Sequence, residues 1–419
     1  MRNEETLPGR PESGSGCPVA PAYPFPFDHP LRPPTEWARL REPGCPIPEV
    51  TVRASGDTVR VLTRYEDVRT ALSDERRFDR DLSIGGAARL TADETGGPFA
   101  IPDRSGPLSS GAAHQRWRRL VNRHFTAKRM TALQPRIREI AHSLVDDMES
   151  GPHPADLASA FAFPLPVQVI GALLGAPAEH WDRFSYWSQL LFSLDRYSAE
   201  EIRTGHDDFT AYMRELVTRL REKPGDDLLS ELATTSGTDE GMPEDELVLT
   251  GKLLLAAGHE TTSAMIGKIT AILLEDRTRW ERLKDDRSLL PTAIEELLRY
   301  DVNRGVGLPR YLNEDVDLDG RTIPARTTVV TVLPAANRDE TVFPAADRLD
   351  FTRSPNPHLA FGAGPHSCLG QSLARTELRV AFETLFDRLP DLRLAIPAEE
   401  LQHRQGQITG SLREIPVMW

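Results

Sequence analysis

The stretch FGAGPHSCLG, from Phe361 to Gly370, gathers three glycines, a histidine and a cysteine near the C-terminal end of the chain. The chain has only three cysteines in 419 residues, so the place of Cys368 in a glycine-rich loop needs an explanation. Gly362, Gly364 and Gly370 allow the backbone to turn tightly around the sulfur and to point amide hydrogens at it. The helix expected directly after the loop adds the positive end of its dipole. Both features favour a thiolate, whereas most free cysteines are buried apolar thiols.

A thiolate in such a loop is either a nucleophile or a metal ligand. A nucleophile needs a histidine base, and the spacing of His366, two residues away, does not by itself provide a base and its orienting partner. A zinc or iron–sulfur site needs further ligands, and Cys17 and Cys45 lie in an N-terminal region expected to be loose. One thiolate suits a metal that a macrocycle already holds, and haem with an axial cysteine fits best.

The loop resembles the haem-binding loop of the cytochrome P450 family, F-G-x-G-x-H-x-C-x-G, and matches it at every fixed position. The resemblance implies that Cys368 is the proximal ligand of the haem iron. It also implies that His366 contacts a haem propionate and that Phe361 packs beside the sulfur, with Gly362 and Gly364 shaping the loop.

A second motif, AAGHETTSA, interrupts an apolar helix expected from about Glu244 to Leu274. An ordinary buried helix can hold hydroxyl groups that bond to the preceding turn. A carboxyl group in such a setting is costly unless water or function compensates. The motif resembles the family's A-G-x-E-T-T over the distal haem face. The resemblance implies that Glu260 and Thr261 relay protons to bound dioxygen and that Gly258 shapes the oxygen groove.

The segment EELLRY places Glu296 and Arg299 on one helix face. Alone, such a pair is typical of a surface ion pair worth about 0.3 kcal/mol. It resembles the family's E-x-x-R motif, which implies a buried pair bridged to a later arginine that helps to hold the cysteine loop. We assign Arg348, in FPAADRLDFTR, as that third partner, although Ala346 and Leu349 depart from the usual P-x-R-F.

In HQRWRRLV, His114 and Arg118 lie one turn apart and can bind a carboxylate together. They resemble the H-x-x-x-R of bacterial family members, which implies contacts to haem propionates, with Arg310 of LPRYLNED as the matching arginine from a later strand. The alternative is a basic, solvated helix face. We expect that alternative for the neighbouring arginines and for a patch that docks an acidic ferredoxin: Arg116, Arg119 and Arg123.

Composition narrows the class of protein. A net charge of -13 argues against a general nucleic-acid binder. No run approaches about 18 apolar residues, so no membrane span is expected. The first residues contain no apolar signal-peptide core, and the sparse, odd set of cysteines suits a reducing compartment, so we expect a cytoplasmic protein without a disulfide framework.

The periodicities predict a mainly α protein with minor β structure, an α+β fold in a single domain. Residues 1–22 are expected to be disordered, and residues 23–419 to form one P450 domain of helices around a buried haem. The run TVRASGDTVRVLT predicts a hairpin, and residues 80–112 predict a long loop.

By resemblance, the chain is a haem-thiolate monooxygenase that binds haem b (heme b), uses O2 and oxidises an apolar small molecule in bacterial secondary metabolism. The chain carries no flavin or iron–sulfur motif, so electrons are expected from NAD(P)H through a separate reductase and ferredoxin. We expect a monomer. Two alternatives stay open: oxidative coupling or cyclisation without oxygen insertion, and a haem-binding sensor or carrier without turnover.

The substrate pocket is expected to draw on four segments: residues 81–111, 184–197, 302–308 and 409–412. Within them, aromatic residues suit an aromatic or polycyclic ligand but also suit packing. The candidate substrate contacts are Phe99, Trp187, Phe192, Val302 and Leu412.

Overall fold

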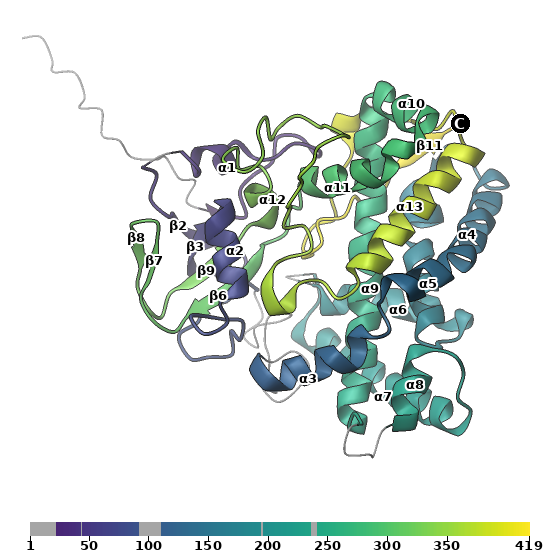
Figure 1. Ribbon diagram of the computed structural model, residues 1–419, viewed down its shortest axis with the longest axis horizontal. Helices are drawn as coiled ribbons and strands as arrows, with labels where there is room; N and C mark the ends of the chain where they lie inside the picture. Colours follow the sequence, from purple (N-terminus) through teal and green to yellow (C-terminus); the bar gives the residue numbers. More distant parts are fainter. Residues whose placement is uncertain (1–21, 43, 92–109, 194–195, 236–240) are drawn as a thin grey trace, which may run out of the picture.

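The fold is mainly helical with a smaller β portion, as predicted (Figure 1). The structure is a computed structural model that describes residues 22–42, 44–91, 110–193, 196–235 and 241–419. Its α-helices are α1 (Thr35–Arg39), α2 (Tyr65–Ser73), α3 (Gly111–Asn122), α4 (Ala127–Glu149), α5 (Pro164–Leu173), α6 (Trp181–Leu191), α7 (Ala199–Glu222), α8 (Leu228–Thr235), α9 (Glu244–Glu275), α10 (Arg277–Asp285), α11 (Leu290–Tyr300), α12 (Leu333–Ala336) and α13 (Gln371–Arg388). Short π and 3-10 segments are η2 (Ala158–Ala162), η3 (Ala178–His180), η4 (Arg287–Leu289), η5 (Gly364–His366) and η6 (Ala398–Glu400).

The strands form one mixed sheet and two small antiparallel ones. The large sheet has the order β1-β2-β3-β9-β6-β4. It joins the N-terminal part of the chain to a much later part, because β3 pairs in parallel with β9. The predicted hairpin is confirmed, since β2 and β3 pair antiparallel with Val50 opposite Val59. The small sheets are β10-β11-β5 and β7-β8. The strands are β1 (Ala22–Tyr23), β2 (Glu49–Val52), β3 (Thr58–Leu62), β4 (Phe78–Asp79), β5 (Ala155–Asp156), β6 (Leu308–Leu312), β7 (Val316–Leu318), β8 (Arg321–Ile323), β9 (Thr328–Thr331), β10 (Arg393–Leu394) and β11 (Pro416–Met418).

Helix α9 runs through the helical half of the molecule and packs against α5, α6, α7, α8, α10 and α13 (Figure 1). Its first turn carries Glu244, Asp245 and Glu246, whose charges complement the positive end of the helix dipole. Most of the residues that follow are apolar and buried, which explains why the sequence predicted its bounds so closely.

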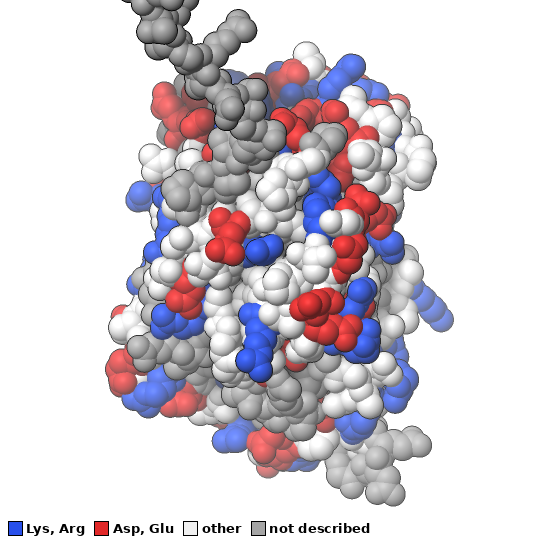
Figure 2. All heavy atoms as spheres, turned by 90° about the vertical axis from the view of Figure 1, so that its left-hand side faces the viewer, with Lys and Arg blue, Asp and Glu red and all other residues white. Residues whose placement is uncertain are grey.

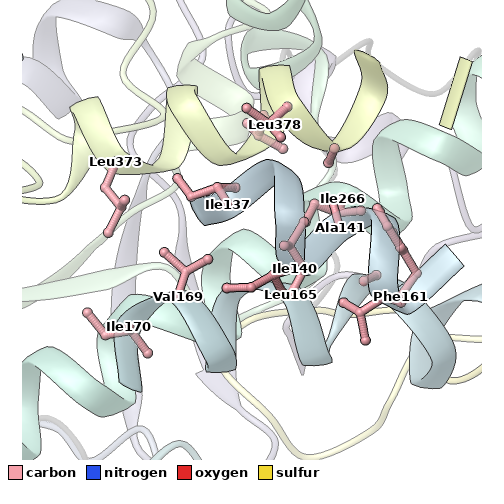
Figure 3. Packing of buried hydrophobic residues seen from close by; sticks show 14 of the residues in the cluster. Ile137, Ile140, Ala141, Phe161, Leu165, Val169, Ile170, Ile266, Leu373 and Leu378 are labelled. Atoms are coloured by element: carbon pink, nitrogen blue, oxygen red, sulfur yellow. The ribbon is translucent and has the colours of Figure 1, made fainter. Parts of the chain in front are cut away.

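The main hydrophobic core lies where α4, α5, α9 and α13 meet (Figure 3). Branched side chains from each helix interdigitate there, and burying one such side chain stabilises the fold by about 1.5–3 kcal/mol. The residues that Figure 3 labels in this cluster are Ile137, Ile140, Ala141, Phe161, Leu165, Val169, Ile170, Ile266, Leu373 and Leu378.

The cysteine loop joins the helical half to the sheet half. The segment η5 within the loop packs against α2, which follows β3 of the large sheet. The helix α13 that leaves the loop packs against α4, α9 and α11. The loop is therefore held from both sides.

Further expectations from the sequence can be compared with the described residues. The segment 1–22 lies almost wholly outside the described residues, although Ala22 already belongs to β1. Cys45 is disulfide-bonded, which the sparse set of cysteines did not lead us to expect. In the described part of the chain, no helix combines the length and hydrophobicity needed to cross a membrane. Figure 2 shows basic and acidic side chains intermingled on one face rather than gathered into a patch of one sign.

Candidate functional site

The loop around Cys368 is closed by its own backbone. The Gly362 N–H donates to the Leu359 carbonyl at 2.8 Å, and the Cys368 N–H donates to the Phe361 carbonyl at 2.8 Å. The Gly370 N–H donates to the sulfur of Cys368. These bonds fix the direction of the thiol just before α13 begins at Gln371.

Gly364 is required where the loop meets α2. Its φ is +73°, and a Cβ there would lie 2.6 Å from the Cα of Ser73 and 2.8 Å from the carbonyl oxygen of Leu72. Such distances are far below van der Waals contact, so any side chain would push the loop away from α2. The glycine sets how closely the cysteine loop approaches the sheet half.

Cys368 is exposed by surface area although protein surrounds it, as is typical of a residue that lines an internal space. Burial raises the pKa of the Cys368 thiol, while the Gly370 N–H and the charges of Arg118 and Arg375 act in the opposite direction. The sequence predicted that amides and the helix dipole would favour the thiolate. The Gly370 N–H acts in that direction, and burial acts against it.

One narrow stripe of α9 is also exposed, although the residues beside it on the helix are buried. Ala257 and Thr261 are exposed one turn apart, whereas His259 and Glu260 beside them are buried. The Thr261 hydroxyl donates to the Ala257 carbonyl at 3.1 Å. Burial raises the pKa of Glu260, against an opposing effect from Arg404. Glu260 therefore keeps its proton to a higher pH than an exposed glutamate does.

Gly258 has a packing role that the sequence did not predict. A Cβ on Gly258 would lie 2.7 Å from Cγ1 of Ile170, one of the α5 residues in Figure 3. The missing side chain thus allows α9 and α5 to pack closely. The expected oxygen groove at Gly258 stays a prediction.

Basic side chains from separate segments meet beside the cysteine loop. The rings of His114 and His366 lie 3.9 Å apart between centroids, and His114 donates from Nε2 to the Pro365 carbonyl at 3.3 Å. Arg80 Nη1 donates to Nδ1 of His366 at 2.7 Å, and His366 Nε2 donates to Glu75 at 2.5 Å. The charges of Arg310 and Arg118 also act on His366.

Two arginines of this cluster have no acidic hydrogen-bond partner among the described residues. Burial and then the neighbouring cations lower the pKa of His366 to about 2, and burial lowers the pKa of Arg310 to about 9. In the described part of the chain, Arg118 forms no hydrogen bond or ion pair, and Arg310 donates only to the Pro309 carbonyl at 2.7 Å. Arg310 is buried and Arg118 is half-buried, and a guanidinium without a directly bound acid suits a carboxylate of a ligand.

The E-x-x-R pair is buried as predicted, but its third partner is Arg353. Arg299 binds Glu296 through two hydrogen bonds of 2.8 Å, and both side chains are fully buried. Arg353 Nε donates to Glu296 at 3.0 Å, whereas Arg348 contributes only its carbonyl, 3.3 Å from Arg299. The assignment of Arg348 was wrong because its side chain is exposed, whereas the Arg353 side chain is only 10% exposed and reaches Glu296.

Comparisons with known proteins identify the family. A profile of the family described as Cytochrome P450 matches residues 162–390. Mycinamicin IV hydroxylase/epoxidase from Micromonospora griseorubida is 43% identical over 404 residues, covering 95% of this chain and 98% of that protein. The chain belongs to the cytochrome P450 family.

Other relatives place the P450 among bacterial oxygenases. Nocardicin C N-oxygenase from Nocardia uniformis subsp. tsuyamanensis is 40% identical over 367 residues, covering 87% of this chain and 90% of that protein. The structure of the putative thioether synthase SgvP, involved in the tailoring step of griseoviridin, matches with a TM-score of 0.88 at 37% identity, covering 96% of this chain and 100% of that chain. The chain is a P450 monooxygenase, and the family uses haem iron and O2.

Three of the four predicted pocket segments of the P450 meet in space. The Ile408 N–H, one residue before the segment 409–412, donates to the Phe192 carbonyl at 3.2 Å. A Cβ on Gly410 would lie 2.5 Å from Oδ1 of Asn303, so the C-terminal turn also touches the segment after α11. Leu308 of β6 is 36% exposed, which is unusual for a leucine in an inner strand.

The individual substrate candidates fare less well. Trp187 is buried and stacks on Phe209 at 4.7 Å, so it is a core residue rather than a pocket wall. Val302 and Leu412 are also buried in hydrophobic clusters, while Phe192 is half-buried. Phe99 lies outside the described residues. The sequence did not predict Arg80, because the surrounding residues FDRD match none of the family motifs named above.

Proposed function

We propose that the P450 binds haem b with Cys368 as the axial thiolate and inserts oxygen from O2 into a small organic molecule. The observation that carries this assignment is the pairing of an exposed thiol with the cation cluster that faces it from other segments. A porphyrin with two propionates supplies both the metal for the thiol and the carboxylates for the cations.

The propionates are assigned to the cluster formed by His114, Arg118, Arg310, His366 and Arg80. Arg118 and Arg310 are the strongest members, since each is a guanidinium without an acidic partner among the described residues. Phe361 closes the proximal side, because its carbonyl holds the Cys368 N–H.

Bound haem iron supplies the activation of dioxygen, and the chain supplies protons and orientation. Burial raises the pKa of Glu260, so the carboxyl group keeps its proton to a higher pH than an exposed glutamate does. Thr261, exposed on the same turn, has free acceptor capacity on a hydroxyl that donates to Ala257. Together they form a short path that moves a proton from the interior of α9 to the exposed stripe.

Electrons are proposed to come from NAD(P)H through a reductase and a ferredoxin, without a flavin or iron–sulfur cluster in this chain. The docking patch needs revision, because Arg116 binds Glu246 at 3.0 Å and is not available as a free cation. Arg119, exposed on α3, remains a candidate contact for an acidic partner. We further propose one P450 domain over residues 23–419 acting as a monomer in the cytoplasm.

The substrate is proposed to be a natural product of bacterial secondary metabolism, as the names of the relatives suggest. Those relatives are named for hydroxylation, epoxidation and N-oxygenation, which supports oxygen insertion over oxidative coupling.

The test uses purified, haem-replete protein. The reduced carbon monoxide complex of the wild type should show the red-shifted Soret band of thiolate ligation, and Cys368→Ser should lose it. Ser367→Ala, beside the ligand, should keep it. Retention of the band in Cys368→Ser, or its absence in the wild type, would overturn the proposed ligand.

A further inference from the structure

A charged network outside the haem-binding residues surrounds the proximal phenylalanine. Arg375 of α13 binds Glu295 of α11 in a bidentate pair, with Nε 2.7 Å from Oε1 and Nη2 2.8 Å from Oε2. His358 donates from Nε2 to the same carboxylate at 3.1 Å. The guanidinium of Arg375 lies 4.4 Å from the ring centroid of Phe361.

This network is distinct from the E-x-x-R pair, although Glu295 and Glu296 are adjacent. Glu296 points inward and is fully buried, whereas the Glu295 side chain is 29% exposed and that of Arg375 is 36% exposed. The inner pair holds the segment that ends at Arg353. The outer pair instead faces the loop that carries the cysteine.

Phe361 connects Arg375 to the backbone of the cysteine. Phe361, on which the guanidinium stacks, accepts the backbone hydrogen bond of Cys368 at 2.8 Å. Arg375 therefore places a cation against the residue that holds the cysteine in the loop.

We propose that Arg375 and Glu295 are positioning residues that set the reduction potential of the iron bound at Cys368, an inference that rests on the proposed function. The Arg375 charge favours the extra electron of the reduced state. Glu295 fixes the guanidinium against Phe361 and cancels part of its charge. His358 holds the carboxylate from the other side, so the pair has one geometry.

The two charges predict shifts of opposite sign. Arg375→Gln removes a cation and should lower the potential, so that the ratio of reduced to oxidised enzyme at a fixed potential falls about threefold. Glu295→Gln removes an anion and should raise that ratio by a similar factor. A purely structural role of the pair would move both variants in the same direction.

The chain offers matched controls one turn further along α13. Arg379 and Glu383 form an ion pair at 3.9 Å with exposed fractions of 37% and 28%, close to those of Arg375 and Glu295. Arg379→Gln and Glu383→Gln make the same changes in net charge without contact to Phe361. Each control variant should shift the reduction potential by no more than about a quarter of the shift seen at Arg375 or Glu295.

The experiment is a spectroelectrochemical titration of the haem-replete wild type and these variants, without substrate. Shifts of equal sign at Arg375 and Glu295, or shifts no larger than those of the controls, would overturn the inference. Arg375→Lys keeps the charge and should keep most of the potential, so a fall as large as that of the glutamine variant would also contradict it. Absence of the thiolate Soret band in the wild type overturns the proposed function itself, whereas a normal band with unshifted potentials overturns only this inference.

Discussion

Gly364 shows how one residue sets the distance between the cysteine loop and α2. Its positive φ alone costs a non-glycine residue about 1–2 kcal/mol. The overlap of a Cβ with the backbone of α2 adds to that cost, because backbone cannot move aside as a side chain can. The sequence predicted a glycine-rich turn here, but it could not show that α2 is the neighbour that demands glycine.

Gly364→Ala should therefore lower haem retention and destabilise the protein by about 2–4 kcal/mol in urea unfolding. Gly320→Ala is the matched control, since Gly320 has a φ of +74° but no atom within 4 Å of its Cβ position. The control should lose only the cost of the strained φ and should bind haem normally. Equal losses in both variants would contradict the packing explanation.

The proton path also belongs to single residues. Thr261→Ala and Glu260→Gln should each divert reducing equivalents to peroxide and lower the yield of product per NAD(P)H by about tenfold or more. Ser263→Ala, which removes a nearby hydroxyl on α9, should leave coupling unchanged. The measurement is peroxide and product per NAD(P)H consumed, and wild-type coupling in Thr261→Ala would exclude the relay.

At the scale of elements, the sequence predicted those helices and strands whose bounds depend on local residue patterns. The bounds of α9 and the β2–β3 hairpin follow from periodicity and from a glycine turn, and both were predicted closely. The partner of Glu296 was not, because Arg353 lies in the irregular segment after α12, whose path no periodicity encodes. Arg80 was missed for the same reason, since it reaches His366 across 286 residues of sequence.

The correction at this segment is testable. Arg353→Gln leaves one charge of the buried Glu296 network without its partner and should lower the free energy of unfolding by about 1–3 kcal/mol. Arg348→Gln changes an exposed side chain and keeps the backbone carbonyl that contacts Arg299. The free energy of unfolding should therefore change by no more than about 0.5 kcal/mol. Chemical denaturation of both variants decides between them, and the reverse order of effects would restore the original assignment.

At the scale of the whole molecule, the interior carries acidic groups that folding must keep neutral. Glu377 of α13 is fully buried, and neither carboxyl oxygen has a hydrogen-bond partner. Burial raises its pKa well above the ordinary value of 4.5. The unfolded chain releases this proton near that ordinary value, while the folded chain holds it. The stability associated with Glu377 is thus complete below the unfolded pKa and is lost as pH rises toward the folded pKa.

Glu377→Gln removes this titration while it keeps the shape of the side chain. Its gain in the free energy of unfolding over the wild type should grow as pH rises above the ordinary glutamate pKa of 4.5, by at most about 1.4 kcal/mol per pH unit. Glu222→Gln, at the exposed end of α7, should show no such growth. Urea unfolding at several pH values gives both curves. A gain that stays constant with pH would mean that Glu377 titrates in the folded protein as it does in the unfolded chain.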